Sequence, residues 1–236
     1  MPSANKPRGN SSGSGREGTP LRITRSALDL FEELGYLGTT IDAIAERAGV
    51  ARRTFFHHFR SKDDVVFAHH HDLTKKVVDY LGQPTELSAV SRVHGAVELI
   101  FSSYVSDPEL SRRRYRLVRQ NAELRNREIA WVSGYQRLFA GFLRERLGEE
   151  PRGVMFAESF AAASVSTHNM ILREWLRSTD PPYDPMQRLD DGLRWLASAF
   201  PLQTQAPRTP RVLVALLDGE PDARTVSDAL SALRFP

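Results

Sequence analysis

Side chains that recognise nucleic acid are concentrated in one short stretch, ARRTFFHHF, at residues 51–59. Arginine pairs through two hydrogen bonds with guanine edges in the major groove, while threonine and histidine suit phosphates or bases. Phe55 and Phe59 are four residues apart, so in a helix they share an inner face. The outward side chains are then Arg52, Arg53, Thr54, Phe56, His57 and His58. This composition predicts a short helix with one core face and one DNA-binding face.

Histidines raise a second chemistry, metal binding, because five of the seven lie between residues 57 and 71. His69, His70 and His71 would point about 100° apart on a helix, however, so they cannot converge on one ion. The chain also lacks cysteine, an H-E-x-x-H pair, a glycine-rich phosphate loop and a G-x-S-x-G turn. We therefore expect no enzyme activity, no metal site and no cofactor. A module that only binds other proteins would leave the outward arginines unexplained.

The elements around the DNA-binding stretch fit a helix-turn-helix. Apolar residues recur at spacings of three and four across residues 21–35, which predicts a first helix. Thr40 is placed to cap a second helix over residues 41–48, and Gly49 suits the left-handed conformation that ends a helix. A tight turn after Gly49 then leads into the short helix at 52–59.

The segment that follows is expected to connect the DNA-binding part to the rest of the chain. Ser61 and Asp64 form an S-x-x-D capping box, which predicts a long helix from Ser61 to about Leu81. This helix would begin near DNA and end among the carboxy-terminal helices. We therefore expect it to carry movement between the two parts.

Positive charge is concentrated at the amino-terminal end. Residues 1–62 hold ten lysines and arginines against six acidic residues, although the whole chain of 236 residues has a net charge of only +3. Residues 1–20 are rich in glycine, serine and proline and carry Lys6, Arg8 and Arg16, which predicts a disordered basic arm. A basic third on a near-neutral body indicates an anionic partner for that third.

These motifs, in this order, resemble the amino-terminal domain of the TetR family of bacterial transcriptional regulators over about residues 21–70. The matching segments are the helix at 21–35, TTIDAIAERAGV, ARRTFFHHF and SKDD. The resemblance implies DNA contacts from the cap of the second helix, from the recognition helix and from the start of the fourth helix. The residues at those places are Thr40, Arg52, Arg53, Thr54, Phe56, His58 and Lys62.

Two residues depart from the family pattern. Ala51 stands where many members have serine, so the recognition helix lacks a side-chain cap worth about 0.5–2 kcal/mol. Phe56 stands where many have tyrosine, so a hydroxyl contact to phosphate is lost. These departures affect individual contacts and leave the expected fold unchanged.

The rest of the chain is also predicted to be helical, which makes the fold class all-α. We expect a basic arm at 1–20, a three-helix DNA-binding domain at 21–65, and a larger helical domain for effector binding and dimerisation at 66–200. Residues 201–236 form a carboxy-terminal extension, in which VLVALL fits either a helix or a strand.

Aromatic residues interrupted by polar ones mark a candidate pocket in helices at about 127–147 and 152–178. Such stripes are usually plain core, but in the TetR family this domain commonly encloses a small effector. By that resemblance the ligand-binding candidates are Phe101, Tyr104, Trp131, Tyr135, Phe139, Phe160, Ser164 and His168. We expect an apolar or amphipathic ligand.

The run RRRYRLVRQ at residues 112–120 admits two interpretations. Its arginines are similar to those with which some family members bind the phosphates of an acyl-coenzyme A. They also fit a solvated helix face on which arginine stems cover neighbouring residues, and we favour this second interpretation.

A segment of small side chains, FAAASVS at residues 160–166, would let helix backbones approach closely. This suits a dimer interface built with a helix at about 186–200, and tight packing within one subunit is the alternative. The family resemblance favours a homodimer.

These features together predict a dimeric repressor that binds a palindromic operator in double-stranded DNA and is released by a small-molecule effector. An activator or an effector-independent regulator is the alternative. No apolar run is long enough to span a bilayer, and residues 1–20 lack the apolar core of a signal peptide. We expect a cytoplasmic, nucleoid-associated protein.

Overall fold

The computed structural model describes residues 18–200, apart from the side chain of residue 71, and these residues belong to one compact unit. The described part is helical and contains no strand, so the predicted all-α class is confirmed. The arm predicted at 1–20 lies outside the described residues up to residue 17, and its last part was wrong, because Thr19 and Pro20 already form the first turn of α1. The expectations for 201–236 also lie outside the described residues. The helices are α1 (Thr19–Gly38), α2 (Ile41–Arg47), α3 (Arg52–His58), α4 (Lys62–Val66), α5 (Ala68–Gly82), α6 (Ala89–Val105), α7 (Pro108–Gln120), α8 (Ala122–Leu147), α9 (Pro151–Arg177) and α10 (Pro185–Ala199).

Helix α1 ends where the chain needs a conformation that glycine adopts easily. Gly35 has φ 74°, which breaks the helical path before Gly38. The buried hydroxyl of Thr39 then donates to the carbonyl oxygens of Leu30 at 3.1 Å and of Gly35 at 2.9 Å. The end of α1 is therefore fixed by a side chain that replaces the missing helical donors.

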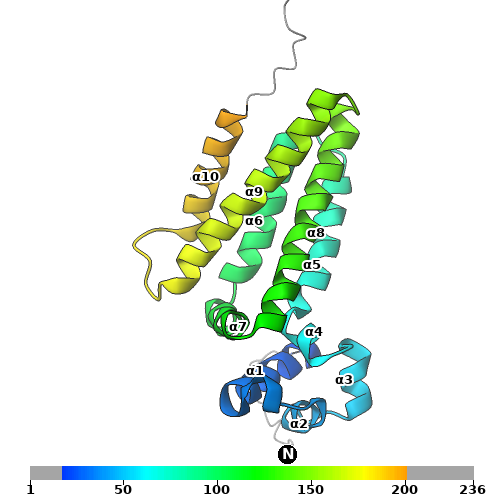
Figure 1. Ribbon diagram of the computed structural model, residues 1–236, viewed down its shortest axis with the longest axis vertical. Helices are drawn as coiled ribbons and strands as arrows, with labels where there is room; N and C mark the ends of the chain where they lie inside the picture. The colour runs from blue at the N-terminus through cyan, green and yellow to red at the C-terminus, as the bar shows by residue number, and fades with distance from the viewer. Residues whose placement is uncertain (1–17, 201–236) are drawn as a thin grey trace, which may run out of the picture. The chain divides into compact units, whose positions relative to one another are not determined.

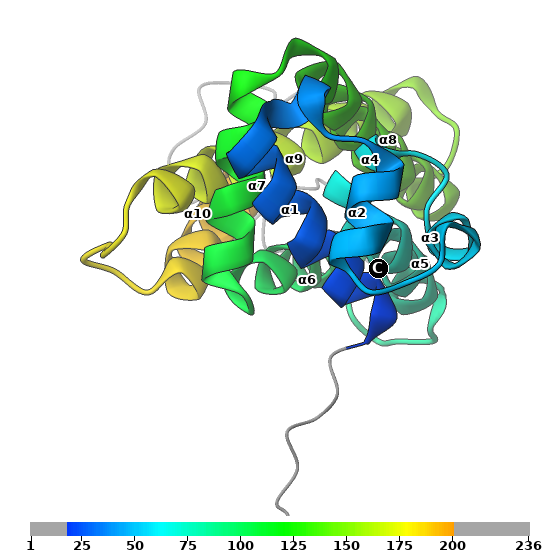
Figure 2. The same ribbon diagram turned by 90° about the horizontal axis from the view of Figure 1, so that it is seen from below.

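The predicted helix-turn-helix is present as α2, a turn and α3. The Thr40 side chain accepts from the backbone N–H of Ala43, which caps α2. Gly49 has φ 63°, and the Val50 N–H donates to the Ala45 carbonyl at 2.9 Å to close the turn. Phe55 is completely buried beneath α3. Helices α1, α2 and α3 are grouped at one end of the described unit (Figure 1), and Figure 2 shows the same helices from below.

The long helix predicted from Ser61 to Leu81 is wrong in one respect, because the chain breaks it at Phe67 into α4 and α5. Val65, Val66 and Phe67 are all buried. These three side chains lie in the core of the amino-terminal helices, whereas Leu73 and Val77 of α5 lie in the core of the bundle. The break at Phe67 therefore falls where the chain passes from one core to the other. The predicted cap is present, since Ser61 accepts from the Asp64 N–H.

Helices α5, α6, α8, α9 and α10 run alongside one another, and α7 lies between the lower end of this group and α1 (Figure 1). Their shared core contains Phe101, Phe139 and Trp175. Among residues 18–200, no helix combines the length and the apolar content that crossing a bilayer requires.

Helix α7 contributes its apolar side to a different core. Leu110, Leu117 and Val118 are buried together with Phe31 and Phe55 of the amino-terminal helices. The amino-terminal helices therefore complete their core with residues that lie far along the chain. As a result, α7 is part of the packing of the DNA-binding helices as well as a neighbour of the bundle.

We predict that Phe55→Ala lowers the free energy of unfolding by about 3–5 kcal/mol, because the substitution leaves a cavity under α3. Its neighbour Phe56 is 44% exposed and provides the control. Phe56→Ala should change stability by about 0.5 kcal/mol. Urea denaturation of both variants measures the difference, and equal losses would show that α3 does not pack through Phe55.

Candidate DNA-binding surface and ligand cavity

The outer face of α3 gathers most of the predicted DNA-binding residues. Arg52, Arg53, Phe56, His57 and His58 are exposed there, and Thr54 is half-buried. Thr40, also exposed, lies at the start of the neighbouring α2. The side chains form one surface, which is the arrangement required of a helix that enters the major groove. Their contacts with DNA remain a prediction.

The two arginines at the start of α3 differ in their present contacts. Arg52 forms an exposed ion pair with Asp42 and lies over the Phe56 ring, 5.4 Å from its centre. Exposed ion pairs contribute little to stability, so DNA can replace this one at small cost. Arg53 forms no ion pair within residues 18–200 and is free to reach a base edge. Ala51 supplies no side-chain cap to α3, as expected from its type.

Lys62, predicted to contact phosphate, is held at the end of α1. Its Nζ donates to the backbone carbonyls of Tyr36 at 2.7 Å and Thr39 at 3.1 Å, and it lies 4.4 Å from the centre of the Tyr36 ring. The last carbonyls of a helix lack intrahelical donors and attract a cation. One of its three N–H donors remains for a phosphate, and that contact stays a prediction.

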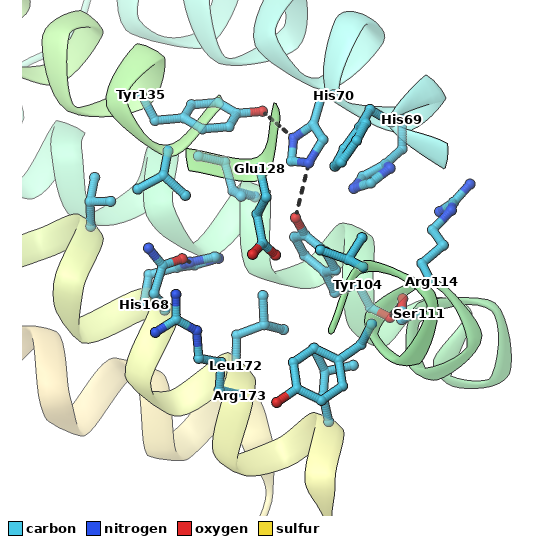
Figure 3. Close-up of a pocket in the computed structure, with 18 of the residues that line it drawn as sticks. His69, His70, Tyr104, Ser111, Arg114, Glu128, Tyr135, His168, Leu172 and Arg173 are labelled. Carbon is cyan, nitrogen blue, oxygen red and sulfur yellow. Dashed lines mark hydrogen bonds between the residues drawn. The ribbon is translucent and has the colours of Figure 1, made fainter. Parts of the chain in front are cut away.

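A cavity lies among α5, α6, α7, α8 and α9, with about 880 Å³ of space between its lining atoms, part of it open to solvent (Figure 3). Four of the predicted ligand residues line it, namely Tyr104, Tyr135, Phe139 and His168. Its lining residues come from α5 to α9 and include Val66 and Phe67, so the cavity exists only in the folded chain.

The other four predicted ligand residues do not line this cavity. Phe101 is fully buried in the bundle core, and Phe160 stacks on Phe156 at 5.5 Å. The Ser164 hydroxyl is buried and donates to the Phe160 carbonyl at 2.8 Å within α9. Trp131 stacks on the His70 ring at 5.1 Å, behind the cavity wall. The periodicity of an aromatic stripe identifies which residues lie on the inner face of a helix. It does not distinguish those that line the cavity from those that are packed in the core.

Sequence reasoning did not assign most of the polar and charged lining residues to a pocket. They come from four helices and include His69, His70, Ser111, Arg114, Glu128 and Arg173. Arg114 belongs to the arginine run and the two histidines to the histidine run, whereas the others are single polar residues within helical patterns. Their convergence is a property of the helix packing, so no local signal could have revealed it.

Burial controls the protonation of the groups in the cavity. It lowers the pKa of His69 well below its usual value and lowers that of His168 to about 4, so both imidazoles are neutral near pH 7. Burial also lowers the pKa of the Arg114 guanidinium to about 10 and raises the pKa of the Glu128 carboxyl. Between Tyr135 and Tyr104 lies the His70 ring, with each hydroxyl 3.4 Å from one of its nitrogens.

Most of the arginine run on α7 is engaged with protein rather than open to phosphate. Arg112 donates to the Ser178 carbonyl at 3.0 Å. Arg113 pairs with Asp29 at 2.6 Å and with Glu32 at 2.9 Å, both on α1. The favoured interpretation, a solvated helix face, fits Arg116 and Arg119, which are exposed, but not Arg112, Arg113 and Arg114, which are partly buried. The ion pairs of Arg113 also tie α7 to the DNA-binding helices.

One group in residues 18–200 has the spacing of metal ligands: His94, Glu98 and Asp190. The His94 Nε2 lies 3.3 Å from Asp190 and 3.6 Å from Glu98, and Arg194 also pairs with Asp190. Arg194 already neutralises the Asp190 carboxylate, and the contact of His94 with Asp190 joins α6 to α10, so the group has a structural explanation without a metal ion.

Two family models match the chain. One, described as bacterial regulatory proteins of the tetR family, matches residues 23–68, and the other, described as the MftR C-terminal domain, matches residues 87–201. MftR of Mycobacterium tuberculosis, a protein named for regulation of mycofactocin biosynthesis, is 27% identical over 166 residues, covering 69% of this chain and 82% of that protein. The HTH-type transcriptional regulator TcmR of Streptomyces glaucescens is 50% identical over 44 residues, covering 19% and 20% respectively.

Solved structures share the fold. NalD, the secondary repressor of the MexAB-OprM multidrug efflux pump in Pseudomonas aeruginosa, superimposes with a TM-score of 0.57 at 21% identity, covering 78% of this chain and 98% of that one. FadR from Bacillus subtilis, in complex with stearoyl-CoA, superimposes with a TM-score of 0.51 at 21% identity, covering 75% and 97%.

We predict that Lys62→Met lowers the free energy of unfolding by about 1–3 kcal/mol, because the charged donor to two carbonyls is lost. Lys75 is exposed on α5 and gives a matched control, for which Lys75→Met should leave the melting temperature unchanged. Thermal unfolding measures both. A stable Lys62→Met chain with reduced DNA affinity would instead support the phosphate contact.

Proposed function

The chain belongs to the TetR family of bacterial transcriptional regulators, and on that premise we propose that it is a repressor released from its operator by a small molecule. It would bind a palindromic site in double-stranded DNA as a homodimer, in the cytoplasm. The observation that carries this proposal is that α7 touches both functional parts. Its Arg113 binds α1, and the adjacent Arg114 lines the cavity.

The proposed DNA contacts divide into two kinds. Arg52 and Arg53, at the amino-terminal end of α3, are placed to read base edges, while Thr40 and the histidines of α3 are placed to contact phosphates or bases. Phosphate contacts carry no sequence information, so the reading of sequence falls mainly to the two arginines.

The outer face of α9 supports the proposed homodimer. Met155 and Met170 are 66% and 56% exposed. Between them, at helical spacing, Ser159, Ala162 and Ser166 remain partly or fully accessible. Small residues allow a partner helix to approach closely, and the exposed apolar side chains would be buried on association. On the adjacent α10, Trp195 is 69% exposed, which extends the apolar area.

The proposed release uses the contacts between the cavity and α1. Asp107 at the start of α7 pairs with Arg25 of α1 at 2.9 Å, and Arg113 pairs with α1 about two turns later. A ligand that moves α7 would therefore move α1 and the helices packed on it. The helix expected to carry this movement, 61–81, is divided at Phe67, so α7 is the more direct connection.

Coupling of this kind is reciprocal. If a ligand weakens DNA binding by some factor, DNA must weaken ligand binding by the same factor, and typical coupling is about 1–3 kcal/mol. Selection of bound fragments from genomic DNA, followed by addition of candidate ligands, tests the proposal. Ligands that leave DNA affinity unchanged would favour the effector-independent alternative. A reporter that rises when the regulator is supplied would favour the activator.

We predict that Arg53→Ala costs about 1–3 kcal/mol of operator affinity and relaxes sequence preference, because a base contact is lost. Arg137, exposed on α8, provides a control with the same charge change. Arg137→Ala should leave operator preference intact. Competition between operator and scrambled DNA gives the measurement, and undiminished discrimination by Arg53→Ala would mean that α3 does not read the bases through this residue.

A second prediction concerns assembly. Trp195→Glu should convert the dimer into a monomer and weaken operator binding, because a charge would be buried at the subunit contact. Leu87, 56% exposed between α5 and α6, is the control, and Leu87→Glu should remain dimeric. Light scattering after gel filtration distinguishes the two, and a dimeric Trp195→Glu chain would place the interface on another surface.

A further inference from the structure

Consecutive arginines of α7 differ in their partners. Arg112 donates to the Ser178 carbonyl, and Arg113 is paired with Asp29 and Glu32. Arg114 has no hydrogen bond or ion pair with any residue of 18–200, and its buried Nε has no acceptor. Arg114 is thus the member of the three that faces the cavity without a counter-ion.

Nearby carboxylates compensate this charge only in part. Asp107 attracts Arg114 electrostatically, but its carboxylate pairs with Arg25 at 2.9 Å and makes no ion pair with Arg114. Glu128 lines the same cavity but makes no ion pair with Arg114 within the described part of the chain, and burial raises its pKa. The Arg114 Nε is buried without an acceptor, and removing a charged donor from water without a partner is costly. The lowered pKa of Arg114 has that cause.

The neighbouring polar groups are also unsatisfied. Both ring nitrogens of His69 are buried without a hydrogen-bond partner, and so is the Nε2 of His168. A neutral imidazole carries one N–H donor. Figure 3 shows His69 and Arg114 together at one side of the cavity. A hydrogen-bond acceptor with a negative charge would satisfy both residues at once.

We propose that the cavity binds a ligand with a single acidic group on an apolar body, and that Arg114 is the counter-ion of that group, with His69 as a second donor. This inference rests on the proposed function, in which the cavity is the effector site. Carboxylate matches the fork of a guanidinium with two parallel hydrogen bonds. Val97, Ile100, Phe139, Val165 and Leu172 supply the apolar wall for the body of the ligand.

The net charge of the residues that line the cavity indicates how many acidic groups the ligand carries. Two arginines, Arg114 and Arg173, face one carboxylate, Glu128. The histidines His69 and His168 are neutral near pH 7 because burial lowers their pKa values. A single negative charge restores balance, whereas the phosphates of a coenzyme A would have to remain outside.

The position of Arg114 gives the acidic group a route to the DNA-binding helices. Arg114 and His69 also line a second groove, whose other residues include Leu21 and Thr24 of α1 and Phe56 and His57 of α3. A carboxylate bound between Arg114 and His69 would therefore lie where the cavity meets this groove. Its arrival changes the electrostatics next to α1 and α3 directly.

The first experiment needs no ligand. Arg114→Met removes an unpaired charge and keeps much of the side-chain volume, so the melting temperature of the ligand-free protein should rise. Arg113→Met removes a paired charge on the same helix, so its melting temperature should fall. A fall for Arg114→Met as well would show that Arg114 serves the fold, and would overturn the proposal.

The second experiment uses decanoate, decanol and decylamine as probes in titration calorimetry. Decanoate should bind the wild type, and Arg114→Met should weaken it by about tenfold or more. Glu128→Gln should tighten decanoate, because it removes the opposing charge, while the exposed Arg116→Gln should not change it. Absence of decanoate binding, or equal binding of decanoate and decanol, would overturn the proposal.

Operator binding by the wild type and by Arg114→Met is measured in parallel. If both bind the operator and decanoate binds as expected, the proposal is supported. Failure of the wild type to bind DNA removes the proposed function. Intact DNA binding with no preference for the acid removes the charge-specific ligand alone.

Discussion

The contact between α7 and α1 is the one on which the rest of the structure depends. Leu110, Leu117 and Val118 fill the core of the DNA-binding helices, and Arg113 closes the edge of this contact with two carboxylates. Apolar burial supplies most of the stabilisation, while the ion pairs fix the register between the two helices. The bundle and the recognition helix are therefore joined by a packed, directional interface in place of a flexible linker.

The cavity has the opposite character. A folded chain usually satisfies its buried polar atoms, yet His69, Arg114 and His168 each leave one or more unsatisfied at this site. The well-paired contact at α1 and the unpaired groups of the cavity are separated by one residue along α7. One side of α7 thus stabilises the contact with α1, and the other side presents unpaired polar groups to the cavity.

The helix-turn-helix was predictable because its signals are local. Thr40 caps α2, Gly49 allows the turn between α2 and α3, and the spacing of Phe55 and Phe59 identifies the inner face of α3. Both helices can therefore be predicted from residues that are neighbours in the sequence. The cavity was half predictable: Tyr104, Tyr135, Phe139 and His168 line it, whereas Arg114 and Glu128 could not be assigned. Which polar residues converge depends on the crossing of five helices, and no spacing within one helix contains that information. The break at Phe67 was missed for a related reason, since it falls where the chain passes from the core of the amino-terminal helices to the core of the bundle.

Val66 and Phe67 belong to the core of the DNA-binding helices and also form part of the cavity wall. Selection therefore acts on these two side chains in two ways, through the stability of the DNA-binding helices and through the shape of the cavity. A substitution that reshapes the wall for another ligand also alters the stability of the DNA-binding domain, and a substitution that strengthens that domain alters ligand preference. Evolution of new effector specificity along this wall is constrained to steps that both roles tolerate. Change is less restricted on the opposite wall, where Val165 and Leu172 contribute only to the bundle.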